Sequence, residues 1–174
     1  MKKIIKAFAL LMALICSLSA FASCNASGDS NDDKNADGKI EFYIIYKSTK
    51  IELDKKADNV LSALGNPKSA DSLGECKGVG EQIRYTYDNL ILYTIKSETD
   101  ETIDQIAFLN DLIETPRNIC IGDSGNKVIE AYGTPTAKAD NKIEYESGTF
   151  LLKFGLESNG NVKSINFIRF TPTN

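Results

Sequence analysis

The sequence predicts an α+β fold in which two tandem repeats, each a short helix followed by an antiparallel meander, place their helices on one face of an antiparallel sheet. The first observation is an internal match: Val-Leu-Ser-Ala-Leu-Gly-Asn-Pro at 60–67 aligns with Val-Ile-Glu-Ala-Tyr-Gly-Thr-Pro at 128–135. The second is that runs of alternating apolar and polar residues follow both segments in the same order. The third is composition, because a chain of 174 residues that is 42% hydrophobic and 25% charged is typical of globular proteins.

The N-terminus predicts a lipoprotein signal peptide over residues 1–23. A lysine-rich start precedes an apolar run at 7–18, which is shorter than the roughly 20 residues that span a bilayer. The run leads into Phe21-Ala22-Ser23-Cys24, which resembles a bacterial lipobox, and Cys24 is therefore the predicted site of lipid attachment. The alternative is plain secretion, with cleavage after Ala20-Phe21-Ala22.

The segment 24–39 predicts a flexible polar tether, because it contains no large apolar residue with which to form a core. Loss of the signal peptide removes three lysines and no acid, which leaves 17 basic and 24 acidic residues and a net charge of −7. Nucleic acid and anionic lipid headgroups repel an acidic protein. We therefore expect no nucleic-acid partner, and attachment to the membrane through the lipid anchor alone.

Part of the tether matches the start of a calcium-binding loop. Asp33, Asn35 and Asp37 have the spacing of the first three EF-hand ligands. The twelfth position requires glutamate and is Ile44, and the residues at 42–46 are typical of a strand. We interpret the segment as an acidic linker with at most weak calcium binding, and we expect no other metal and no cofactor.

Each repeat is predicted to begin with a short helix. Asp54 and Ser124 stand where an N-cap oxygen would bind the first free N–H groups. Gly65 and Gly133 stand at the C′ position, each two residues before a proline. Three strands then follow in each repeat, at 82–87, 90–96 and 103–109, and at 142–147, 149–156 and 162–169. The expected organisation is a first repeat at 40–110, with a leading strand, and a second at 111–174.

Several short motifs resemble known families. Ile121-Gly122-Asp123-Ser124 and Tyr132-Gly133-Thr134-Pro135, ahead of a meander, resemble outer-membrane assembly lipoproteins of the BamE type. As a tandem pair, the units resemble the β-lactamase inhibitor protein, in which helices back a concave antiparallel sheet. Leu64-Gly65-Asn66-Pro67, Cys76 and Tyr85-Thr86-Tyr87 resemble a group of uncharacterised Firmicutes lipoproteins. The resemblance to the Firmicutes lipoproteins implies a protein on the outer face of the cytoplasmic membrane of a Gram-positive bacterium, and no activity.

Two cysteines, Cys76 and Cys120, remain once Cys16 leaves with the signal peptide and Cys24 carries lipid. A bridge between them is one interpretation, because exported domains contain disulfides. It would close a loop of about 44 residues and stabilise the fold by roughly 4 kcal/mol. The alternative is two free thiols that behave as small apolar residues. The sequence leaves both interpretations open.

The chain contains no histidine, so Ser-His-Asp triads and histidine-ligated metals are impossible. Glu144 and Glu146 share one strand face, as a glycosidase pair would. Alternating charge on the solvent side of an antiparallel strand explains them equally well. We expect no enzyme, with a carboxylate-dependent hydrolase as the remote alternative.

The predicted function is a monomeric, non-catalytic module whose open sheet face binds another protein or an envelope polymer. Strand alternation places seven candidate residues on that face: Arg84, Thr86, Glu144, Glu146, Lys153, Ser164 and Asn166. The alternatives are a merely solvated surface, and a passive structural or envelope-assembly lipoprotein that docks through a sheet edge.

Overall fold

The computed structural model describes residues 39–76 and 79–170. It begins with a hairpin of two strands, β1 (Tyr43–Tyr46) and β2 (Thr49–Glu52). Lys47 and Ser48 between them have positive φ angles of 49° and 61°, as in the type I′ turn that suits the right-handed twist of a hairpin. The turn sets the register in which Ile44 pairs with Ile51.

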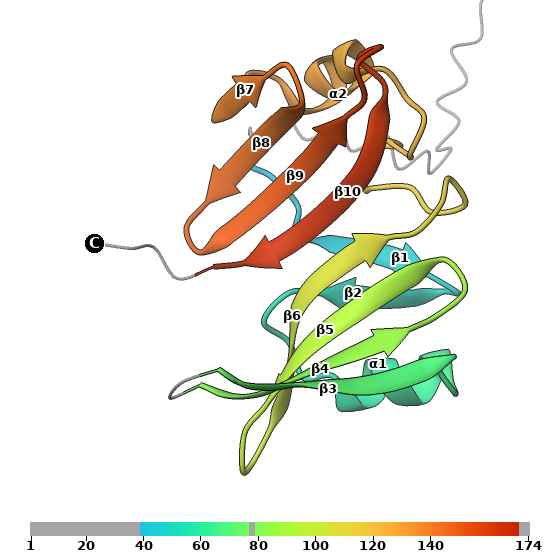
Figure 1. The fold of residues 1–174 in the computed structure, drawn as a ribbon, viewed down its shortest axis with the longest axis vertical. Helices are drawn as coiled ribbons and strands as arrows, with labels where there is room; N and C mark the ends of the chain where they lie inside the picture. Colours follow the sequence, from blue (N-terminus) through green and yellow to red (C-terminus); the bar gives the residue numbers. More distant parts are fainter. Residues whose placement is uncertain (1–38, 77–78, 171–174) are drawn as a thin grey trace, which may run out of the picture. The chain divides into compact units, whose positions relative to one another are not determined.

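The hairpin is followed by helix α1 (Asp58–Leu64) and four antiparallel strands, β3 (Ser69–Cys76), β4 (Gly80–Thr86), β5 (Leu90–Lys96) and β6 (Glu101–Phe108). A long connection leads to helix α2 (Gly125–Tyr132) and four more strands, β7 (Ala137–Ala139), β8 (Lys142–Ser147), β9 (Phe150–Leu156) and β10 (Val162–Arg169). Because β6 pairs with β10, the two meanders form one eight-stranded sheet in the order β3-β4-β5-β6-β10-β9-β8-β7 (Figure 1).

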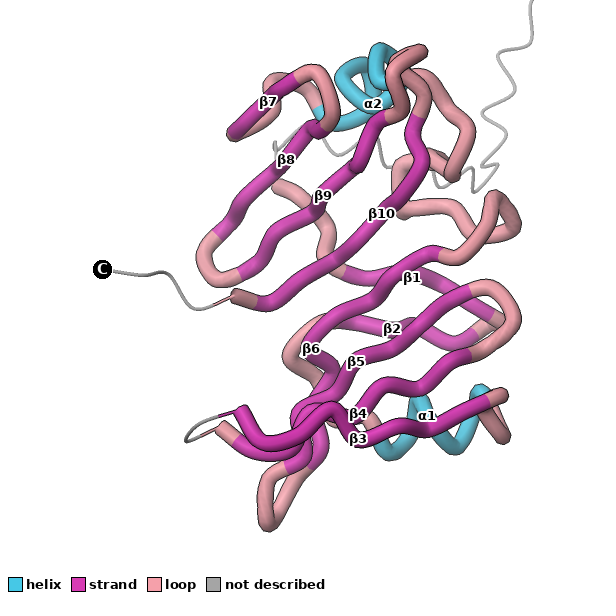
Figure 2. The backbone as a smooth tube through the Cα atoms, viewed as in Figure 1, coloured by secondary structure: helices cyan, strands magenta, loops and turns pink. Residues whose placement is uncertain are grey.

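The predicted α+β class is wrong, because the protein is mostly β. Its two described helices have seven and eight residues, and all other regular elements described are strands. The predicted arrangement, in which the helices of two helix-plus-meander repeats cover one face of the sheet, is also wrong, because the two short helices share that face with the hairpin and the 109–124 connection. The hairpin packs in the same core as the sheet. Figure 2 shows α1 beside β3 and β4, at one end of the strand order, and α2 near β8 and β9, towards the other end.

Alternation predicted the inner strands well. The predicted strands at 90–96, 142–147 and 162–169 are confirmed residue for residue by β5, β8 and β10, and β4, β6 and β9 differ from prediction by one or two residues at their ends. Strands β2, β3 and β7 were not predicted, because β3 and β7 are polar edge strands and β2 is a four-residue strand.

The helix ends agree with the sequence at three of four positions. Ser124 is the N-cap of α2 and accepts a hydrogen bond at Oγ from the Lys127 N–H at 3.2 Å. Gly65 and Gly133 end the helices with φ angles of 75° and 77°, which glycine adopts without steric cost. The prediction for Asp54 is wrong, because α1 begins four residues later, after Ala57.

One face of the eight-stranded sheet forms the core with the hairpin, both helices and the 109–124 connection. Its largest fully buried side chains include Leu92, Ile106, Phe154 and Phe167 from the sheet and Ile44 and Ile51 from the hairpin. The described residues all belong to one compact unit, Asn35–Asn174. Among the described residues, no helix has the length and apolar character needed to cross a bilayer.

Candidate functional site

The other face of the eight-stranded sheet is the candidate site. In β5, Leu90 and Leu92 are fully buried, whereas Ile91 and Tyr93 are partly exposed. Successive side chains of a strand point to opposite faces, so Ile91 and Tyr93 lie on the side away from the core. No described helix or strand covers this side in Figure 1. We call it the open face.

Strand pairing aligns the residues of the open face in rows across the sheet. One row consists of Thr86, Ile91, Ala107, Asn166, Lys153 and Glu144. The next consists of Arg84, Tyr93, Gln105, Ile168, Leu151 and Glu146. Ser164 lies opposite Gly155 in a third row. All seven residues predicted from the sequence therefore share this face.

The seven predicted residues do not form one cluster. Arg84 and Thr86 are on β4 and Glu144 and Glu146 are on β8, which is five strand spacings away. At about 4.8 Å per spacing, the two groups lie roughly 24 Å apart. The candidate site is therefore a broad surface with a predicted group towards each end.

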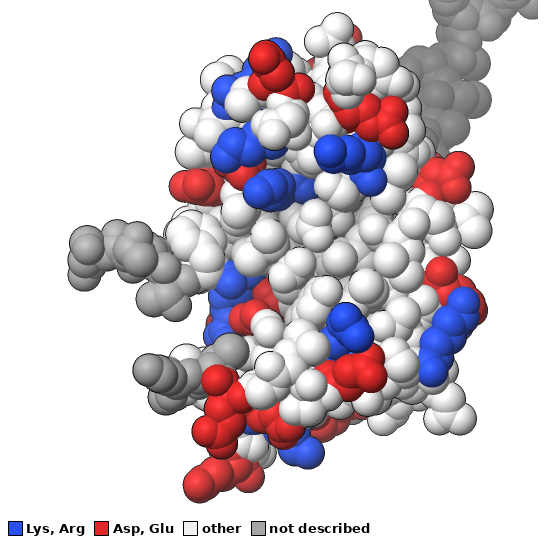
Figure 3. All heavy atoms as spheres, in the orientation of Figure 1, with Lys and Arg blue, Asp and Glu red and all other residues white. Residues whose placement is uncertain are grey.

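The centre of the open face contains, beside the predicted Asn166, four residues that the sequence analysis missed. They are partly exposed, uncharged and mostly large: Ile91, Tyr93, Leu151 and Ile168. Figure 3 shows the same feature, a central area without charged side chains, with basic and acidic groups above and below it. A signal was present in the sequence, because β5 is apolar at successive positions, a pattern typical of strands covered on both faces.

Glu144 is less available to a partner than the sequence analysis expected. Its side chain is 9% exposed and forms ion pairs with Lys142 Nζ at 2.6 Å and Lys153 Nζ at 3.4 Å. Burial alone would raise the pKa of this carboxyl, but the hydrogen bonds from the two lysines outweigh burial and lower the pKa. Glu144 therefore links β8 to β9 through its ion pair with Lys153. Glu146, by contrast, is exposed.

At the opposite end of the open face, Arg84 Nη2 forms an ion pair with Asp71 Oδ2 at 3.0 Å. The hydrogen bond from Arg84, and a second from Ser69 Oγ, lower the pKa of the Asp71 carboxyl. Both charged side chains are more than one third exposed, so we assign the pair little stability. In the centre, Gln105 Nε2 donates to Asn166 Oδ1 at 3.4 Å and joins β6 to β10.

Cys120 is a free cysteine, which favours the alternative of free thiols over a bridge to Cys76. Topology gives the reason. Cys76 ends β3, whereas the residues next to Cys120 bond to β10 through the Gly122 N–H and the Val162 carbonyl. Strands β3 and β10 are four spacings or roughly 19 Å apart in the sheet, and a disulfide requires Cα atoms within about 7 Å. The Cys120 thiol instead donates to Asp123 at 3.5 Å, and burial raises its pKa.

Other predicted sites fall outside the described residues. Cys24 and the weak calcium ligands Asp33, Asn35 and Asp37 precede residue 39, where the description begins. Within residues 39–76 and 79–170, no group of three or more acidic or cysteine side chains is arranged to hold a metal ion.

Comparisons with known proteins identify no family. No protein-family model matches the chain, and no curated protein matches it. Among solved structures, the chain is similar to an extracellular protein containing an SCP domain from Bacillus anthracis, at a TM-score of 0.40 and 10% sequence identity. The similarity covers 67% of this chain and 44% of the other.

Proposed function

We propose that this protein is a lipid-anchored, extracytoplasmic binding module that acts without catalysis and meets another protein or an envelope polymer with its open face. The signal-like segment at 1–23 and the lipobox-like Cys24 support the anchor and the compartment. The uncharged centre of the open face supports the mode of binding. The resemblance of its sequence motifs to those of Firmicutes lipoproteins supports an anchor on the outer face of the cytoplasmic membrane.

The observation that carries the proposal is the composition of the open face. Stable interfaces have a centre depleted of charge and enriched in aromatic residues, inside a polar rim. Here Tyr93 and Ile91 lie beside Ala107 and Gln105 at the centre, and the ion pairs of Glu144 and Arg84 lie towards the ends. In both rows the residues on β5, β6 and β10 are uncharged, and Lys153 on β9 is paired with Glu144.

The edges of the same sheet give the docking alternative no support. Strand β3 has a bulge between Ser72 and Gly74 and carries the charged side chains of Asp71 and Glu75. Strand β7 has three residues and an exposed lysine, Lys138. Bulges, short strands and charged side chains are the usual protection of an edge against added strands.

Site-specific photo-cross-linking in the native envelope tests the proposal. A benzoylphenylalanine replacing Tyr93 places the reactive group at the centre of the open face, and the control replaces exposed Asp58 on α1. We expect one discrete adduct from position 93 and none from position 58. An adduct from Ala70 on edge strand β3, with none from position 93, would favour docking through the edge instead.

The anchor is tested separately by mass spectrometry of the mature N-terminal peptide. We expect a diacylglyceryl-modified Cys24 as the first residue, and no acyl group at Cys76 or Cys120. A mature protein that begins at Ser23 with no acyl group would show secretion without an anchor.

A further inference from the structure

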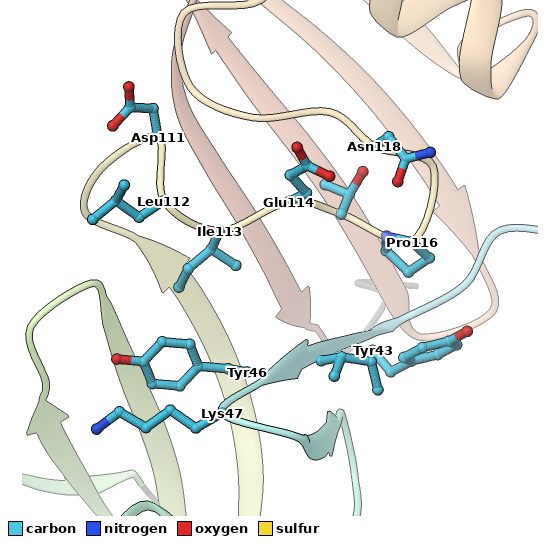
Figure 4. Close-up of a pocket in the computed structure, with 11 residues that line it drawn as sticks. Tyr43, Tyr46, Lys47, Asp111, Leu112, Ile113, Glu114, Pro116 and Asn118 are labelled. Carbon is cyan, nitrogen blue, oxygen red and sulfur yellow. The ribbon is translucent and has the colours of Figure 1, made fainter. Parts of the chain in front are cut away.

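A groove of about 670 Å³ lies along β1, apart from the open face. One wall is the hairpin, through Tyr43, Ile45 and Lys47, and the other is the segment 111–118. Figure 4 shows this segment running along β1 on the side away from β2. The hairpin packs into the core on the other side of the sheet, so the groove and the open face are separate surfaces.

The edge of β1 that faces the groove has free backbone groups. The Leu53 N–H donates to the Phe42 carbonyl at 3.1 Å, and in an antiparallel pair hydrogen-bonded residues alternate with outward-facing ones. Phe42, Ile44 and Tyr46 therefore bond to β2. The N–H and C=O groups of Tyr43 and Ile45 point away from it. No described residue forms a hydrogen bond with these outward groups.

The opposite wall is held in place before any ligand arrives. Thr115 is buried, and its N–H and Oγ1 bond to the main chain of Ile119 at 2.9 and 3.2 Å. Arg117 forms an ion pair with Glu41 at 3.0 Å and donates to the Ala131 carbonyl at 3.0 Å. A preformed wall lowers the entropy cost of binding.

The side chains around the groove define the chemistry of a ligand. Ile45 on one wall is 57% exposed and Leu112 on the other is 73% exposed, and each offers a large apolar contact. Asp111 and Glu114 are exposed on the same wall as Leu112, against one cation, Lys47, among the lining residues. The groove therefore suits an occupant with apolar side chains and a positive charge.

We propose that the edge of β1 is a peptide-binding site that takes an extended segment of a partner protein as an added strand. The main chain of the segment bonds to Tyr43 and Ile45. Its apolar side chains cover Ile45 and Leu112, and a lysine or arginine faces Asp111 and Glu114. Main-chain bonds give affinity to this mode of recognition, and alternate side chains give it specificity.

The chain's own tether fits the groove poorly. Residues 25–39 contain four aspartates and two lysines and no large apolar residue, so they match neither the exposed apolar groups nor the acidic wall. A second copy would bring its own β1, whose residues 43–46 carry no charge to meet Asp111 and Glu114. Charge complementarity thus favours a basic segment of a different protein.

The experiment pans random seven-residue peptides on phage against the detergent-solubilised full-length chain, and measures binding of the recovered sequences as synthetic peptides. We expect recovered peptides to alternate apolar residues and to include a lysine or arginine. N-methylation at alternate peptide amides should weaken binding roughly tenfold, and methylation at the amides between them should not, because only every second N–H meets β1.

Two variants of the protein test the location. Ile45→Pro removes an outward N–H without breaking a bond to β2, so we expect the hairpin to remain folded and peptide affinity to fall roughly tenfold. Ile45→Lys should weaken binding at least as much, because it removes the apolar contact and repels a basic peptide. The matched control is Leu73→Lys, which changes an equally apolar residue, 47% exposed, on β3 and should leave binding unchanged.

Three results would overturn the proposal. The first is no enrichment of any peptide class. The second is equal binding to wild type and Ile45→Lys. The third is a concentration-dependent dimer that Ile45→Lys abolishes while no peptide is recovered, which would assign the groove to a second copy. Cross-linking from position 93 is unaffected by any of these results, so this site and the open face succeed or fail independently.

Discussion

The two meanders of the sheet follow helices that are held in different ways. In both cases, the segment before the helix forms a backbone bridge, Lys56 with Thr102 and Ser124 with Asn161. Helix α2 then adds a side-chain cap and buries Tyr132 in a cluster of aromatic rings. Helix α1 has no side-chain cap, and its buried residues are aliphatic.

The two helices show which interactions stabilise each half of the protein, the first half being α1 with β3–β6 and the second α2 with β7–β10. Tyr132 lies 5.3 Å from the ring of Tyr145 and 5.6 Å from that of Phe154, and the Arg117 guanidinium is 4.9 Å from its centroid. Main-chain bonds hold the approach to both helices: the Asp54 and Ala57 N–H groups donate to carbonyls at the start of β6, and the Gly122 N–H donates to the Val162 carbonyl of β10. The second half thus adds specific side-chain contacts to main-chain bonds that both halves have.

The largest expected effect is the loss of an aromatic side chain from the second half. Tyr132→Ala should cost about 4 kcal/mol, because it removes a buried ring and its contacts with two other rings. Leu64→Ala at the corresponding end of α1 should cost about 2–3 kcal/mol. Urea unfolding followed by circular dichroism measures both, and equal losses would remove the contrast between the halves.

A smaller effect is expected at the helix N-termini. Ser124→Ala should lower the free energy of unfolding by about 1 kcal/mol, because the Lys127 N–H loses its acceptor. The reciprocal change, Ala57→Ser, should give no gain. Ala57 is fully buried and has helical angles, φ −81° and ψ −25°, from which a serine oxygen does not cap. A stabilised Ala57→Ser variant would show that α1 merely lacks a cap.

The sequence predicted local features better than class. Alternation placed β5, β8 and β10 and the open-face side of all seven candidate residues, because period-two patterns follow directly from strand geometry. The fold class was mispredicted because the edge strands β3 and β7 form by pairing with β4 and β8. Neither strand has an alternating apolar pattern from which it could be predicted. The burial of Glu144 was not predicted because its two lysine partners lie on different strands, Lys142 on β8 and Lys153 on β9. Their approach to Glu144 depends on the register between the strands.

The smallest expected effect is a pH dependence at Glu144. Its pKa is lowered in the folded protein from the ordinary value of 4.5, so its contribution to stability is complete above that pH and is lost as the pH falls through the lowered pKa. Glu144→Gln should therefore flatten the loss of stability between about pH 5 and pH 3. Unfolding midpoints at several pH values measure this, with exposed Glu146→Gln as the matched control. Identical pH profiles for Glu144→Gln and wild type would mean that the ion pairs with Lys142 and Lys153 do not form in solution.

The affinity of the cross-linked partner, once purified, for open-face variants tests the central claim most directly. Ile168→Glu places a charge at the uncharged centre, and calorimetry should show binding weakened roughly 30-fold or more, as for an interface hot spot. The thermal midpoint of the variant is measured alongside, and Leu73→Glu on β3 should bind as wild type does. Unchanged affinity for a folded Ile168→Glu variant, with binding lost in Leu73→Glu, would contradict the open-face account.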